Sequence, residues 1–90
     1  MSDAMSILKH PISTEKAVGL VDKLNVITYV VDYRASKKDI TKEFERMFGV
    51  KVASVHTINL PTNTKKAFIK LAREYKASDV AEKLKLVSYG

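Results

Sequence analysis

The segment of residues 30–55, VVDYRASKKDITKEFERMFGVKVASV, predicts a strand, a capped helix, a glycine stop and a second strand in direct succession. Ser36 and Asp39 approximate a capping box, with aspartate in place of the usual glutamate or glutamine. Four large apolar residues then recur at the spacing of one helix face: Ile40, Phe44, Met47 and Phe48. Gly49 follows where helices commonly end in a left-handed residue. The segment contains no set of residues suited to catalysis.

The chain before this segment predicts a short strand and a helix. Ser6–Lys9 is expected to be a brief edge strand stopped by Pro11, since proline cannot donate to an interior ladder. Ser13 or Thr14 is expected to cap the helix, with Glu15 in its first turn, where the helix dipole favours an anion. The apolar stripe of this helix is Ala17, Val18, Val21 and Leu24.

Three further strands are expected. Asn25–Tyr33 is rich in β-branched and aromatic residues and is the clearest strand of the chain. Lys51–Leu60 and Lys65–Ala72 form a hairpin around the turn residues Pro61–Thr64.

A short helix is expected at Ala77–Lys85, capped by Ser78 or Asp79. Its inward-facing residues are Val80, Ala81 and Leu84. The order β-α-β-α-β-β with a short C-terminal helix predicts an α+β fold, a ferredoxin-like sandwich on an antiparallel four-stranded sheet. Ninety residues suffice for one core, so residues 1–90 are expected to form a single domain.

The charge balance indicates an anionic partner. Lysine and arginine number 16 against 10 acidic residues, a net charge of +6, which favours nucleic acid or an anionic membrane surface. Cysteine is absent, which excludes disulfides and suits a reducing cytosol. We find neither a signal peptide nor an apolar run of membrane-spanning length, and we expect a soluble, cytoplasmic protein.

Candidate catalytic residues are scarce. His10 and His56 are the only side chains that could act as bases or nitrogen ligands at neutral pH, and they lie on different predicted elements. The glycines are scattered, so no phosphate-binding loop is present. We therefore expect no enzyme, no cofactor, no metal and no small-molecule substrate.

The strand at residues 65–72 places cations and an aromatic ring on one face. Lys66, Phe68 and Lys70 share that face, and the residues of the other face are Ala67, Ile69 and Leu71. A Lys–Phe–Lys stripe could meet phosphates with its ammonium groups and a base or sugar with its ring. Alternatively, this second face of the sheet is also covered and the lysines extend from its rim.

Arg34, Lys37 and Lys38 surround the start of the second helix. Backbone N–H groups at a helix start attract anions, so these cations could complete a phosphate site. Lysines also populate exposed first turns without any ligand. Because cations there oppose the helix dipole, the pattern favours a functional reading.

Three segments, in this order, resemble the ribosomal large-subunit protein twenty-three family, which lines the exit of the polypeptide tunnel. They are PISTEKA at 11–17, VVDYRASKKDITKEFERMFGVKVASVHT at 30–57 and KKAFIKLA at 65–72. The resemblance implies a four-stranded antiparallel sheet and a monomer that binds large-subunit rRNA beside neighbouring ribosomal proteins. It also implies an exposed surface that receives the signal recognition particle, the protein-conducting channel and chaperones.

The resemblance implies RNA contacts for Thr14, Lys16, Arg34, Lys37, Lys38, Lys65 and Lys66. The basic residues Lys9, Lys51 and Lys70 complete the set of RNA-binding candidates. Glu15 matches the acidic position that the family presents to ribosome-associated factors.

This chain departs from the family in three features. His56 stands before Thr57, where the family often has asparagine, and the role of this histidine stays open. The connection PTNT is short, and a long basic N-terminal extension is absent; both features resemble archaeal members. The alternatives are a free RNA-binding regulatory module of ferredoxin-like fold and a small acyl-phosphate hydrolase. The hydrolase would need an arginine and an asparagine on one phosphate cradle.

Overall fold

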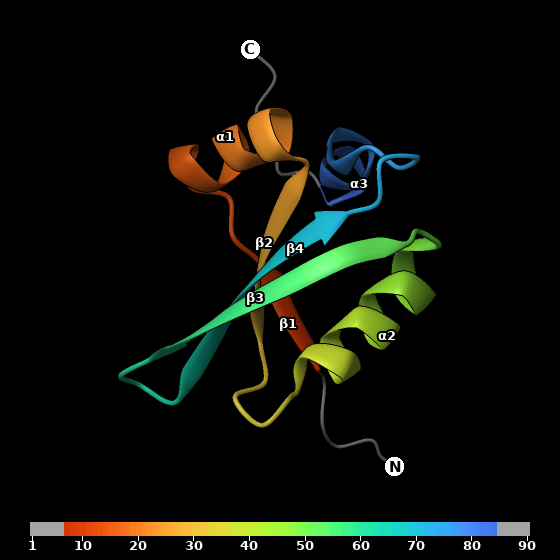
Figure 1. The fold of residues 1–90 in the computed structure, drawn as a ribbon. Coiled ribbons are helices and arrows are strands. Elements are labelled where there is room, and N and C mark those ends of the chain that lie inside the picture. Colours follow the sequence, from red (N-terminus) through yellow and green to blue (C-terminus); the bar gives the residue numbers. More distant parts are fainter. Residues whose placement is uncertain (1–6, 85–90) are drawn as a thin grey trace.

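The computed structural model describes residues 7–84 and shows one antiparallel sheet with three helices (Figure 1). The elements are β1 (Leu8–Pro11), α1 (Glu15–Leu24), β2 (Val26–Val31), α2 (Lys37–Phe48), β3 (Val52–Leu60), β4 (Thr64–Leu71) and α3 (Ala77–Lys83). The strand order across the sheet is β1-β2-β4-β3, with every neighbouring pair antiparallel. The predicted α+β ferredoxin-like sandwich is therefore confirmed.

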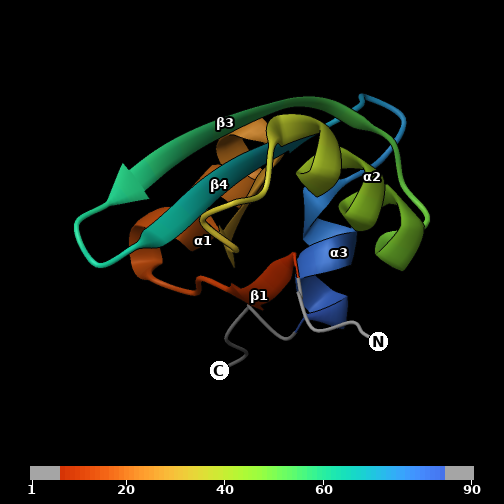
Figure 2. The same ribbon diagram turned by 90° about the horizontal axis from the view of Figure 1, so that it is seen from below.

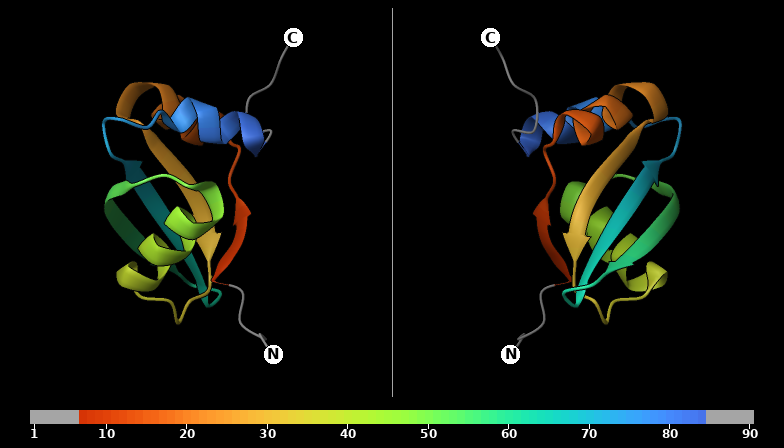
Figure 3. Two further views of the ribbon diagram at one scale, coloured as in Figure 1. Left: turned by 90° about the vertical axis from the view of Figure 1, so that its right-hand side faces the viewer. Right: turned by 90° about the vertical axis from the view of Figure 1, so that its left-hand side faces the viewer.

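The helices divide between one face and one end of the sheet. α1 and α3 contact each other at the same end of the strands (Figures 1 and 3). α2 runs along one face and packs mainly on β3. The β3–β4 turn reaches out on the side away from α2, as Figure 2 shows from below. This turn and the part of the opposite sheet face towards β3 thus stay accessible beyond the helices.

The core lies between the sheet and α2 and α3. Alternate residues of β4 and β2 face it and are fully or almost fully buried: Ala67, Ile69, Leu71, Ile27, Tyr29 and Val31. From α2, the ring of Phe44 packs edge-on against Tyr29 with centroids 6.3 Å apart. The alternation predicted for the strand at 65–72 is confirmed, and Lys66, Phe68 and Lys70 face the other way.

Local sequence signals explain both ends of α2 and the start of α1. Ser36 and Asp39 form the predicted capping box, and Gly49 adopts the left-handed conformation with φ 63°. At α1, Thr14 rather than Ser13 is the N-cap, and its Oγ1 accepts a hydrogen bond from the Ala17 N–H at 3.2 Å. These short-range contacts stabilise helix ends independently of the rest of the fold.

Asn25 corrects the predicted start of the second strand. The prediction placed Asn25 in the strand, whereas it ends α1 in the left-handed region, with φ 61°. Its side chain donates to the carbonyls of Leu71 and Tyr75, and its Oδ1 accepts from the Ala77 N–H at 2.6 Å. Asparagine tolerates this conformation better than most residues, and here its amide also joins three segments.

Some other predicted boundaries were also wrong, and two are not tested, because Ser6 and Lys85 lie outside the described residues. Pro11 does not stop β1 but is its last residue, which an edge strand permits because the missing N–H faces no neighbour. Neither Ser78 nor Asp79 caps α3, because the helix begins after Lys76 and Asn25 satisfies its first N–H.

Two residues assigned to apolar helix faces are half exposed. Leu24 ends α1 with 54% exposure, and Met47 in the last turn of α2 has 50% exposure. Of the other residues of the predicted stripes, Ala17, Val21, Ile40 and Phe44 are buried, and Val18 and Phe48 are partly buried. Periodicity identifies a face but not how far the sheet beneath it extends.

Candidate nucleic-acid interface

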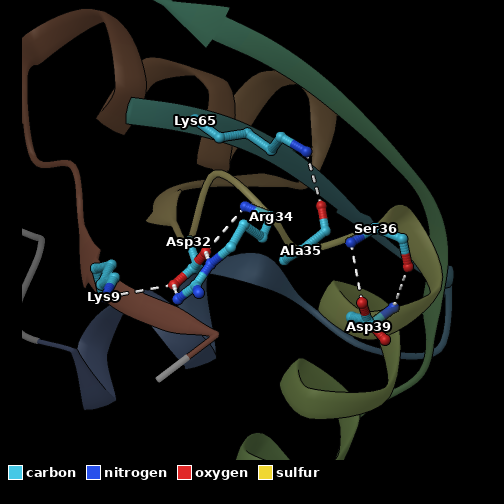
Figure 4. Close-up of polar contacts among 7 residues, drawn as sticks. All are labelled: Lys9, Asp32, Arg34, Ala35, Ser36, Asp39 and Lys65. Atoms are coloured by element: carbon cyan, nitrogen blue, oxygen red, sulfur yellow. Dashed lines mark hydrogen bonds and ion pairs between the residues drawn. The ribbon is translucent and has the colours of Figure 1, made fainter. Parts of the chain in front are cut away.

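Five of the predicted RNA-binding cations gather around the connection between β2 and α2. We call Lys9, Arg34, Lys37, Lys38 and Lys65 the loop cluster (Figure 4 shows three of them). They come from β1, from the β2–α2 connection, from the first turn of α2 and from β4. Elements far apart in the sequence are brought together here because β1 and β4 both flank β2.

Asp32 contacts two cations of the loop cluster, Arg34 and Lys9, although it was not among the predicted site residues. Its carboxylate accepts hydrogen bonds from Nε and Nη2 of Arg34, both at 3.1 Å, and from the Arg34 N–H at 2.9 Å. Lys9 Nζ lies 3.8 Å from the same carboxylate. The hydrogen bonds from Arg34 lower the pKa of Asp32 to about 2. The sequence pattern that could have revealed this ion pair is an acid two residues before an arginine, directly after a predicted strand.

Arg34 is consequently oriented rather than freely mobile. Its side chain is still 59% exposed, and its guanidinium lies 5.6 Å from the ring centroid of Tyr33. Two of its nitrogens are engaged by Asp32, so a phosphate would have to meet Nη1 or an open edge. The ion pair thus fixes the position of one cation in the loop cluster.

Lys65 and Lys66 point to opposite sides of the sheet. Lys65 Nζ donates to the Ala35 carbonyl at 2.7 Å and so ties β4 to the start of α2. Lys66 faces the other side, with Nζ 6.0 Å from the ring centroid of Phe68. Both lysines were predicted to contact RNA, and the two-residue period of a strand means that they would do so on different sides of the sheet.

The start of α2 already carries an anion. The Asp39 carboxylate accepts from the Ser36 N–H at 3.0 Å, and hydrogen bonding to Ser36 lowers the pKa of Asp39. Lys37 and Lys38 are exposed beside it and line a shallow groove against Val55 of β3. The positive charges of these two lysines are therefore exposed to a partner. The positive end of the helix dipole, in contrast, is already partly compensated by the Asp39 carboxylate.

The second group of candidates lines a cleft between α1 and the sheet face that carries Phe68. We call this hollow of about 120 Å³ the α1 cleft. Thr14, Lys16 and Lys66 line it together with Ala17 and Leu20 of α1, Ile12, Thr28 and Phe68. The cleft brings residues from β2, β4 and α1 together at one place.

The sequence left two alternatives for the sheet face that carries Phe68: an open Lys–Phe–Lys stripe or a second covered face. Each alternative describes one part of this face. Near α1 the face is covered, since Thr28 is 2% exposed and Phe68 is half-buried. Towards β3 it is open: Ser54 and His56 are exposed, and Ile58 is 48% exposed. The half-covered ring of Phe68 marks the boundary between the two parts.

The remaining cations among the candidates lie apart from both groups. Lys51 immediately precedes β3, and Lys70 pairs with Val26 and Ser54 towards the same end of the sheet, away from the β3–β4 turn. Glu15 is exposed in the first turn of α1. The cations are thus neither evenly dispersed nor joined into one patch.

The histidines do not meet. His10 lies on edge strand β1 with Nδ1 3.2 Å from the Pro11 carbonyl, and His56 pairs with Phe68 on the other edge strand. No grouping of histidine, cysteine, aspartate and glutamate suited to a metal ion occurs within residues 7–84. In the same residues, no helix combines the length and apolar character needed to cross a membrane.

The fold and its charged surface define a small basic α+β domain. Residues 6–80 match the family described as Ribosomal protein L23, and the chain belongs to that family. The resemblance stated from the three sequence segments is therefore confirmed.

Two relatives are named Large ribosomal subunit protein uL23. One, from Pyrobaculum aerophilum, is 45% identical over 78 residues, which cover 87% of this chain and 96% of the relative. The other, from Trypanosoma brucei brucei, is 39% identical over 85 residues, which cover 94% of this chain and 52% of the relative. The chain thus spans about half the length of the trypanosomal relative and nearly all of the other.

Proposed function

We propose that the chain is a structural constituent of the large ribosomal subunit in the cytoplasm and binds large-subunit rRNA near the exit of the polypeptide tunnel. The observation that carries this proposal is membership of the ribosomal protein L23 family over residues 6–80. The loop cluster supports it, because it gathers cations from four parts of the chain, and all of them except Lys65 are exposed. Residues 1–90 then act as one RNA-binding domain beside neighbouring ribosomal proteins.

The binding mechanism is electrostatic and geometric. Lys37 and Lys38 displace condensed counterions from phosphates, which makes the affinity dependent on salt. Arg34, held by Asp32, adds a cation in a defined orientation. The sheet and α2 present these groups as a fixed surface, which suits structured RNA, because such RNA is recognised largely through its shape, phosphates and 2′-hydroxyls.

Co-sedimentation with ribosomal particles tests this function. The tagged full chain, expressed in cells, is expected to travel with the large subunit through a sucrose gradient and to remain there after a moderate salt wash. A free RNA-binding regulatory module would instead stay near the top of the gradient or leave the particle during the wash. That second distribution would contradict a structural role.

We further propose that Glu15 helps to dock the signal recognition particle or the protein-conducting channel. Its support is exposure at the first turn of α1, next to Lys16, which lines the α1 cleft. An acid at this position is also favoured by the helix dipole alone. Reversing the charge of Glu15 distinguishes the docking role from a role at the helix start, because only the docking role predicts a change in factor binding.

Glu15→Lys is expected to weaken binding of the targeting factor to assembled ribosomes by about tenfold without lowering incorporation, since a like charge replaces an attractive one. Binding is measured by co-pelleting purified ribosomes with the factor. Asp22→Lys, at an exposed acid of the same helix, is the matched control. Equal factor binding by both variants would leave Glu15 only a role at the helix start.

The hydrolase alternative has less support. Arg34 and Asn63 line one hollow near the β3–β4 turn, which is the residue pair that such an enzyme would need. However, the Asp32 carboxylate accepts hydrogen bonds from two nitrogens of Arg34 in that hollow. Asp32 thus already occupies two of the guanidinium nitrogens with which such an enzyme would cradle an acyl phosphate, so we propose a binding role without catalysis.

A further inference from the structure

The α1 cleft contains a buried hydroxyl without a partner. Thr28 Oγ1 has no hydrogen bond, and it is the only buried side-chain oxygen or nitrogen without one in the part of the chain that the structure describes. Thr28 itself is 2% exposed and lines the cleft. An unsatisfied buried hydroxyl destabilises a fold, and valine would fill the same space without that cost. The position therefore carries a polar group that the fold does not need.

The size of the cleft restricts what could meet this hydroxyl. Its volume is about 120 Å³. An apolar cavity of ~150 Å³ accommodates benzene, whereas sites for drug-sized ligands measure roughly 300 Å³ or more. At this size the open cleft suits a single ring better than a fused two-ring system.

The lining has the composition of a site for an unstacked base. Phe68 provides an aromatic ring, and Ala17 and Leu20 provide apolar contacts on the side of α1. Lys16 and Lys66 also line the cleft, so ammonium groups accompany the apolar surface. Aromatic stacking combined with nearby cations is how proteins commonly hold splayed-out nucleotides.

We propose that the α1 cleft receives one unstacked pyrimidine base of RNA. The base contacts Phe68, the Thr28 hydroxyl donates to a ring carbonyl, and Lys16 and Lys66 meet the flanking phosphates. The inference rests on the proposed RNA-binding function and names within it a site that reads a base. The loop cluster, in contrast, offers only charge and shape.

Affinities of the full chain for oligouridylate and oligoadenylate of equal length, measured at one low salt concentration, test the proposal. The uridylate is expected to bind more tightly. Thr28→Val is expected to lower the affinity for uridylate by about two- to tenfold, the range for one neutral hydrogen bond, without destabilising the fold. Phe68→Leu keeps an apolar side chain and is expected to lower the affinity by at least about fivefold through lost stacking.

Thr57→Val is the matched control, because Thr57 lies on the opposite face of the sheet, paired with Ala67. In NMR titrations with oligouridylate, the Thr28 methyl and Phe68 ring signals are expected to shift, and those of Thr57 are not. If Thr28→Val and Phe68→Leu bind uridylate as the parent does, while lysine substitutions weaken it, RNA is held by its phosphates and the cleft proposal is wrong. If the parent binds neither the oligonucleotides nor large-subunit rRNA, the proposed function fails as well.

Discussion

Replacing Asn25 by alanine is expected to destabilise the protein by about 4 kcal/mol, because three hydrogen bonds of roughly 1 kcal/mol each are lost and alanine is strained at positive φ by roughly 1 kcal/mol more. The Asn25 amide bonds the carbonyls of Leu71 and Tyr75, at 3.3 and 2.9 Å, and the Ala77 N–H at 2.6 Å. These contacts connect the end of α1 to the end of β4 and the start of α3. Their loss leaves part-buried backbone groups without partners, which adds to the effect.

Urea unfolding followed by circular dichroism measures this change, and two variants separate its causes. Asn25→Gly tolerates the left-handed backbone but lacks the amide and its three hydrogen bonds, so it is expected to cost about 3 kcal/mol. Asn63→Ala tests the backbone alone, since Asn63 also has positive φ, 55°, in the β3–β4 turn. Its expected cost is about 1 kcal/mol. An Asn25→Ala variant no less stable than Asn63→Ala would show that the three hydrogen bonds contribute nothing.

The combined variant Lys16→Gln, Lys37→Gln, Lys38→Gln and Lys66→Gln is expected to reduce the salt dependence of rRNA binding strongly. Within residues 7–84, none of these ammonium groups has a hydrogen bond or ion pair to the rest of the chain, so their removal spares the fold. Each lost phosphate contact lowers the slope of log affinity against log salt by roughly 0.7 to 0.9, so four contacts lower it by about 3. The affinities of parent and variant are expected to converge as salt rises.

Filter binding to a large-subunit rRNA fragment over a salt series measures the slope. The control is Lys23→Gln, Arg73→Gln, Lys76→Gln and Lys83→Gln, which removes the same charge from exposed positions outside both groups of candidates. This control is expected to lower affinity slightly through net charge while the slope stays near that of the parent. Equal slopes for the two combined variants would mean that RNA senses only total charge and that the candidate positions have no special role.

The site was predicted only in part. Lys37 and Lys38 could be placed beside a helix start because the capping box of Ser36 and Asp39 is a contact over three residues. Whether Arg34 is free could not be predicted, because its engagement depends on how the turn positions Asp32, which also lies 3.8 Å from Lys9 of another strand. The separation of Lys65 from Lys66 was implicit in strand periodicity, but the Ala35 carbonyl that holds Lys65 lies 30 residues away in the chain.

The amino-acid sequence by itself determined the order of the elements, the ends of α2 and the buried face of β4, because capping, left-handed glycine and alternation act over a few residues. Tertiary structure alone decided which cations meet, where apolar helix faces stop, and that Asn25 joins α1 to α3. It also decided that Thr28 and Phe68 share a cleft with Lys16. These arrangements arise when distant segments pack together, and their energies depend on distances that no local pattern encodes.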